Sequence, residues 1–219
     1  MPVRARALIL IAALLAAGAI HLFRPRRAHL REFDPAAVAR LETGMWRDYY
    51  DHHYPAMFGR LYRLERDAYG FSPWDSIRIA WYAAVAAKRF QPTTNRAEAE
   101  AAAVPPLTRY YALIRARSGE SFDPARAARL ELEWWQLRRE HATADAYGAA
   151  VARNAEEVFG TRNDALTASA MLRAAMMHYR DERRDGGMHP ADWDTIAVNL
   201  TRSYEMLRQA VSPVAAGRG

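Results

Sequence analysis

Two glutamates occupy matching places in a stretch that the chain contains twice. Glu42 and Glu131 lie 89 positions apart, as the tenth residues of Phe33–Glu42 and Phe122–Glu131, and each copy is followed four residues later by a tryptophan. Nine of the fourteen aligned positions are identical. Apolar residues at helical spacing surround both glutamates, so we expect each carboxylate on the inner face of a helix.

A carboxylate on an apolar helix face must be paired with a cation, protonated or bound to a metal ion, because a lone buried charge is very costly. The two glutamates are therefore open to two interpretations. In the first, each forms an ion pair with an arginine of the core, for which the sequence offers Arg138, Arg139 and Arg173.

In the second interpretation, the glutamates are ligands of two iron or manganese ions, as in carboxylate-bridged di-metal proteins with ferritin-like or haem-oxygenase-like helical folds. Further ligands would come from the same helix as Glu131 and from a later helix. The chain has no Glu-x-x-His pattern of the ferritin type. His178 and Asp181, on the later helix, are equally compatible with hydrogen bonding on a hydrated helix. The candidate metal ligands are Glu42, Glu131, Glu133, His178 and Asp181.

Several classes of enzyme lack their sequence signatures here. Cysteine is absent, which excludes disulfides, thiolate metal sites and cysteine nucleophiles. The chain also has no phosphate-binding glycine loop, no Gly-x-Ser-x-Gly elbow and no His-Glu-x-x-His motif. We therefore predict a non-enzymatic domain that binds a protein partner or assists assembly, with no cofactor. The alternative is a di-metal oxidase or oxygenase.

The basic character of the chain is concentrated at its N-terminus. Residues 1–32 contain six arginines and one glutamate, whereas the remainder contains 25 basic and 24 acidic side chains. A nucleic-acid-binding domain normally carries its basic excess on the folded surface. We therefore expect no nucleic-acid partner.

The arginines flank an apolar run at residues 7–23, in which His21 is the one polar side chain. Seventeen helical residues span about 26 Å, slightly less than the hydrocarbon core of a bilayer. The run predicts a single-pass anchor in a bacterial-type inner membrane; a cleaved signal peptide and an ordinary buried helix are the alternatives. The Arg-Pro-Arg-Arg cluster at 24–27 favours retention of the segment.

The remaining sequence predicts helices throughout. Asp34-Pro35, Ser72-Pro73 and Asp123-Pro124 each pair a capping residue with proline at the first helical position. We also expect helices to end at Gly70, Gly119 and Gly160, and Pro105-Pro106 to break the helix over 96–117. No stretch alternates with the period of a strand. We expect an all-α bundle of about seven helices, with internal duplication of a helical hairpin as one explanation of the repeat. The expected organisation is an anchor over 1–32, a single α-helical domain over 33–211 and a disordered tail over 212–219.

Overall fold

The computed structural model describes residues 3–183 and 186–212, with side chains described from residue 11 onward. All regular structure in these residues is helical, which confirms the all-α class. The elements are α1 Val3–Phe23, α2 Pro35–Tyr50, α3 Tyr54–Arg63, the π-helical segment η1 Leu64–Ala68, α4 Pro73–Phe90, α5 Arg96–Ser118, α6 Pro124–Arg139, α7 Ala144–Phe159, α8 Asp164–Glu182 and α9 Pro190–Val211.

The described residues form one more helix after α1 than the seven expected from the sequence. The predicted interruption at Pro105 and Pro106 is wrong, because α5 continues through both residues. Each proline removes one backbone donor from the helix, yet packing of α5 against α4 and α6 keeps it continuous. The predicted tail lies almost entirely in residues 213–219, outside the described residues.

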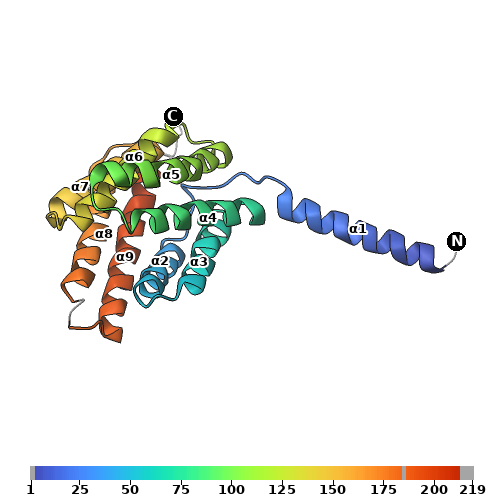
Figure 1. Ribbon diagram of the computed structural model, residues 1–219, viewed down its shortest axis with the longest axis horizontal. Helices are drawn as coiled ribbons and strands as arrows, with labels where there is room; N and C mark the ends of the chain where they lie inside the picture. The colour runs from blue at the N-terminus through green and yellow to red at the C-terminus, as the bar shows by residue number, and fades with distance from the viewer. Residues whose placement is uncertain (1–2, 184–185, 213–219) are drawn as a thin grey trace, which may run out of the picture.

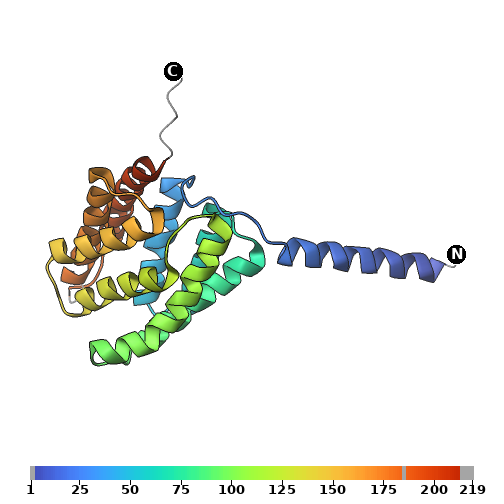
Figure 2. The same cartoon turned by 90° about the horizontal axis from the view of Figure 1, so that it is seen from above.

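The eight helices α2–α9 form a closed ring. Each packs against the next one along the chain, and α9 packs against α2 (Figures 1 and 2). The ring contains two hydrophobic cores. One joins α4, α5 and α6, and the other joins α2 with α7, α8 and α9. The ring divides in chain order into two halves, α2–α5 and α6–α9. The first helix of each half packs with helices of the other half.

The two halves of the ring repeat the same order of elements. α2 and α6 are both 16 residues long, and their caps Asp34 and Asp123 each accept a hydrogen bond from the amide of the second residue in the helix. Both helices end two residues before a left-handed histidine, His52 with φ 58° and His141 with φ 55°. The similarity then continues through the next three helices of each half, so it extends beyond the predicted hairpin.

Contacts between the halves repeat as well. Phe33 packs edge-to-face on Tyr204 at 6.0 Å and 86°, and Phe122 packs on Tyr111 at 6.0 Å and 87°. These pairs link the start of each half to the last helix of the other half. The matching geometry gives the ring an approximate twofold arrangement.

Arg31 lies where the two halves meet. Its guanidinium donates to both carboxylate oxygens of Glu120, at 2.8 and 2.7 Å, and Glu120 is the residue 89 positions later. It also donates to the carbonyl oxygens of Phe159, at 2.6 Å, and Val211, at 3.1 Å. Arg31 thus ties the segments that precede α2 and α6 to the ends of α7 and α9.

Helix α1 projects away from the ring (Figures 1 and 2). It packs on α4, where the ring of Phe23 lies edge-to-face on Trp74 at 5.4 Å. Among the described residues, no helix has the length and apolar composition that a membrane span requires. The segment after α1 joins the folded body before residue 33, because Ala28 and Leu30 are buried.

Candidate functional site

A cavity of about 470 Å³ lies inside the ring, and every helix from α2 to α9 contributes to its walls. Most of the lining is aromatic or aliphatic. Its charged side chains are few, namely Glu42, Glu65, Glu131, Arg138 and Arg173. A predominantly apolar cavity with a few convergent charged groups is the usual form of a small-molecule site.

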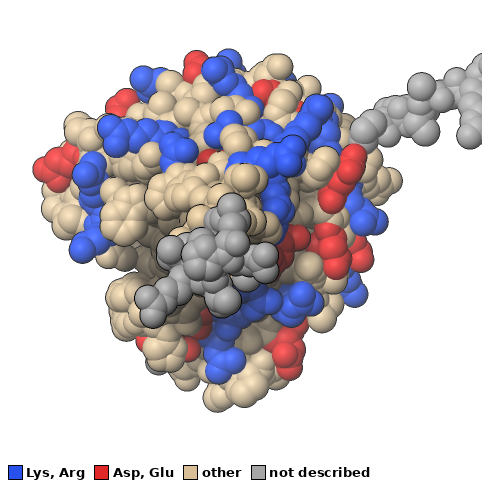
Figure 3. All heavy atoms as spheres, turned by 90° about the vertical axis from the view of Figure 1, so that its right-hand side faces the viewer, with Lys and Arg blue, Asp and Glu red and all other residues tan. Residues whose placement is uncertain are grey.

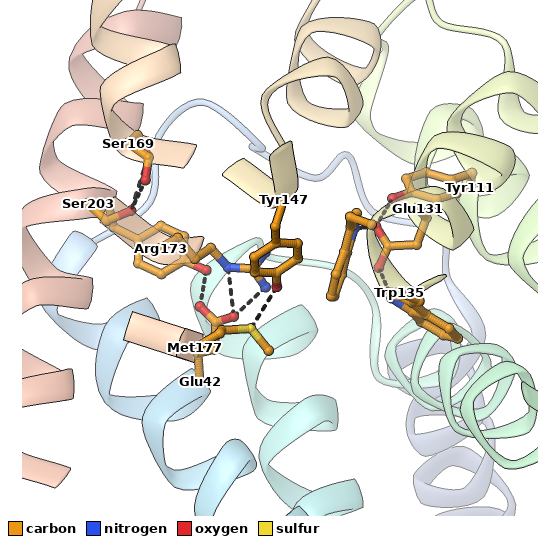
Figure 4. A network of polar contacts seen from close by, with 11 residues as sticks. Glu42, Tyr111, Glu131, Trp135, Tyr147, Ser169, Arg173, Met177 and Ser203 are labelled. Atoms are coloured by element: carbon orange, nitrogen blue, oxygen red, sulfur yellow. Dashed lines mark hydrogen bonds and ion pairs between the residues drawn. The ribbon is translucent and has the colours of Figure 1, made fainter. Parts of the chain in front are cut away.

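Glu42 is held by an ion pair with α8. Its residue is 2 % exposed, and its Oε1 accepts hydrogen bonds from Nε and Nη2 of Arg173 at 2.9 and 2.5 Å (Figure 4). The hydroxyl of Tyr204 donates to the other oxygen. Burial would lower the pKa of Arg173, but the neighbouring Glu42 outweighs it and holds that pKa well above its ordinary value.

Of the two interpretations, the ion pair with a core arginine therefore holds for Glu42, which is buried as expected. Removing one partner of such a pair typically costs about 3–5 kcal/mol, because the other charge is left buried without compensation. The guanidinium of Arg173 also lies 5.4 Å from the ring centre of Trp134, which connects this pair to α6.

Glu131 is held differently, although it occupies the matching position in the other half. Three uncharged donors surround it: the hydroxyl of Tyr111 and the indole N–H of Trp134 at 2.9 Å each, and the indole N–H of Trp135 at 3.0 Å (Figure 4). Burial raises the pKa of Glu131, and the three hydrogen bonds oppose that rise. No ion pair to Glu131 is present among the described residues.

Glu65 is a buried carboxyl group that the sequence analysis missed. It lies in η1, it is 2 % exposed, and it forms part of the cavity wall. Its carboxyl group has no hydrogen bond or ion pair with any described residue, and burial raises its pKa to about 8. The surrounding run from Arg63 to Asp67 is rich in charge, which is typical of a solvated surface. The one signal for burial is that Glu65 follows Leu61 by four residues and so shares its helix face.

The other predicted ligands lie elsewhere. Glu133 pairs with Arg153 at 2.8 Å near the surface, and Asp181 accepts two hydrogen bonds of 3.0 Å from Arg138. His178 packs near Tyr147, with ring centres 6.0 Å apart.

The structure therefore does not bring these three residues together with Glu42 and Glu131. In the described part of the chain, no group of three or more histidine, aspartate or glutamate side chains is placed to hold a metal ion. Glu42 and Asp181, moreover, already have arginine partners. The arrangement gives the di-metal hypothesis no support.

On the face from which α1 projects, basic and acidic side chains are interspersed, without a broad region of one sign (Figure 3). The face shown therefore lacks the basic patch that marks a nucleic-acid-binding surface.

Comparison with known proteins finds no family model, no curated protein and no solved structure that matches this chain.

Proposed function

We propose that the helical ring is a small-molecule-binding domain whose ligand occupies the central cavity. The observation that carries this proposal is the cavity of about 470 Å³ with mainly apolar walls and a few charged groups. Ligand sites in proteins commonly measure roughly 300–1,000 Å³ and have this composition.

A neutral probe and a cavity-filling variant test this function. The intact chain in detergent is titrated calorimetrically with 4-phenylbutan-1-ol, and we expect saturable binding at one site. Ala84 lines the cavity, so Ala84→Phe is expected to weaken binding at least tenfold by occupying the space. Ala97 is exposed at the start of α5, and Ala97→Phe is the matched control.

Two results would contradict the proposal. One is the absence of saturable binding to the folded protein. The other is equal binding by the wild type and Ala84→Phe, which would place the probe outside the cavity. Circular dichroism of each variant establishes that the helical fold is retained.

We also propose that α1 tethers the ring to a membrane of the bacterial inner-membrane type. Support comes from the large apolar side chains that α1 exposes, Ile11, Leu14, Leu15, Ile20 and Phe23, all more than half exposed. Arginines follow at positions 24, 26 and 27, where they would meet lipid headgroups. Membrane fractionation of the intact chain and of a chain without α1 is the measurement that tests this role.

A further inference from the structure

We propose that the central cavity recognises an organic cation, a protonated amine on an apolar body, through the carboxylates of Glu65 and Glu131. This inference rests on the proposed ligand-binding function and adds the chemical class of the ligand.

Glu65 supplies the first argument. Buried polar groups in folded proteins nearly always have a hydrogen-bond partner, and those without one need an explanation. Glu65 is 2 % exposed and faces the cavity, and no described side chain or backbone group bonds its carboxyl. A cationic ligand in the cavity would supply the missing partner.

Helical spacing accounts for the position of Glu65. It lies four residues after Leu61 and eight after Met57, and all three residues line the cavity. Asp67, two residues further on, lies on the opposite side of the helix and is exposed. The helix then ends in a π turn, in which the amide of Tyr69 donates to the carbonyl of Leu64 at 3.3 Å. The spacing thus places an acidic side chain in a wall that is otherwise largely apolar.

The balance of charge in the walls favours a cation over an anion. Both cavity arginines already have carboxylate partners: Arg173 pairs with Glu42 at 2.5 Å, and Arg138 pairs with Asp181 at 3.0 Å. Glu65 and Glu131 are the lining carboxyl groups that form no ion pair with a described residue, although the charge of Arg173 lowers the pKa of Glu131. Above about pH 8, where Glu65 is ionised, an anionic ligand would therefore meet negative charge at Glu65.

Aromatic rings reinforce this preference. Trp134 and Trp135 both donate their indole N–H groups to Glu131, so their rings are fixed around that carboxylate. Tyr69 and Tyr110 line the cavity close enough for Glu65 to raise their pKa values, in addition to the larger effect of burial. Aromatic faces attract organic cations, and a cation held between rings and a carboxylate gains from both.

Three probes of similar shape and different charge test the inference. The intact chain in detergent is titrated at pH 8.5 with 4-phenylbutylamine, 4-phenylbutan-1-ol and 4-phenylbutanoate. An alkylamine is still protonated at that pH, by analogy with lysine, whose pKa is about 10.4. We expect the amine to bind at least tenfold more tightly than the alcohol, and the carboxylate to bind most weakly.

Substitutions then locate the preference. Glu65→Gln keeps the shape of the side chain and is expected to weaken amine binding at least tenfold, while alcohol binding changes less than twofold. Glu131→Gln is a second variant with the same expected direction. Glu133→Gln is the control, because Glu133 lies on the same helix as Glu131 but pairs with Arg153 near the surface.

The outcomes separate this inference from the function on which it rests. If the alcohol binds as tightly as the amine, or the carboxylate binds most tightly, cation recognition is overturned and ligand binding stands. If both glutamine variants weaken amine and alcohol equally, the carboxylates act through shape and the inference also fails. If none of the three probes binds, both proposals fail.

Discussion

At the level of single residues, three glutamates line one cavity and differ in what surrounds their charge. Glu42 has a guanidinium, Glu131 has three uncharged donors, and Glu65 has no partner among the described residues. The free energy of a buried carboxylate depends mainly on such partners. Burial accordingly raises the pKa of Glu65 to about 8, and it raises the pKa of Glu131 against the opposing effect of its donors.

Glu65 should make the stability of the protein depend on pH. Burial raises its pKa from 4.5 to about 8, so between these values the folded state holds a proton that the unfolded state has lost. The stabilisation is fully present below pH 4.5 and is lost as the pH rises towards 8, with a slope of up to about 1.4 kcal/mol per pH unit. Glu65→Gln should remove this slope. Urea unfolding at pH 5, 6, 7 and 8 measures the free energy of unfolding of both proteins.

The tyrosines that face Glu65 do not change charge in the pH range of this experiment. Tyr69 and Tyr110 face it, and burial raises the pKa of both above the range studied, so they stay neutral. Glu42, which acts on Tyr69 from α2, remains paired with Arg173. Glu133→Gln serves as the control and should keep the wild-type slope. Parallel pH profiles for the wild type and Glu65→Gln would show that the carboxyl is already ionised at pH 5.

The sequence could predict Glu42 but not Glu65, for a physical reason. Glu42 lies in a regular amphipathic helix, where spacing identifies the buried face, and Arg173 was among the expected partners. Glu65 has regular helical spacing too, four residues after Leu61, but it lies within a run of charged residues from Arg63 to Asp67. The charged neighbours outweigh that spacing in a pattern analysis, so such a residue is assigned to solvent.

At the level of helices, local capping chemistry determined most boundaries. The Asp-Pro and Ser-Pro starts and the glycine stops at Gly70, Gly119 and Gly160 lie where the sequence predicted them, and all three glycines have positive φ. The prolines in α5 were misjudged because their cost is local, whereas burial of Pro106 and Leu107 against neighbouring helices compensates for it.

Equivalent caps should contribute equally to stability. Asp34 and Asp123 accept cap bonds of 3.0 and 2.9 Å with nearly the same backbone angles. Substitution of either by alanine is expected to cost about 1 kcal/mol, since it leaves one helical N–H without a partner. Urea unfolding of Asp34→Ala and Asp123→Ala measures both costs.

The exposed Asp194, which has no side-chain bond among the described residues, provides the control substitution Asp194→Ala. A large cost at one cap with none at the other would show that the two halves are not equivalent at their helix starts.

At the level of the whole molecule, the ring was not foreseen. The repeat indicated related helices, but it carried no information on which helices meet. Closure depends on packing of α9 against α2 and on Arg31, which joins four segments distant in sequence. The cavity follows from closure, because eight helices in a ring leave space at the centre that three or four helices would fill.

Helix α1 and the ring should be separable, and the segment between them should belong to the ring. A chain of residues 23–219 keeps Phe23 on Trp74 and loses only the projecting helix, so its thermal unfolding midpoint should equal that of the intact chain. A chain of residues 33–219 begins at the boundary suggested by the sequence. It lacks the buried Ala28 and Leu30 and the Arg31 network, and should unfold at a clearly lower temperature.

The same two chains test the membrane role. If α1 is the tether, the intact chain stays in the membrane pellet after an alkaline carbonate wash, whereas residues 23–219 are released to the supernatant, because the exposed apolar side chains of α1 are then absent. Release of the intact chain by carbonate would exclude an integral anchor. An equal midpoint for residues 33–219 and 23–219 would show that Arg31 does not stabilise the closed ring.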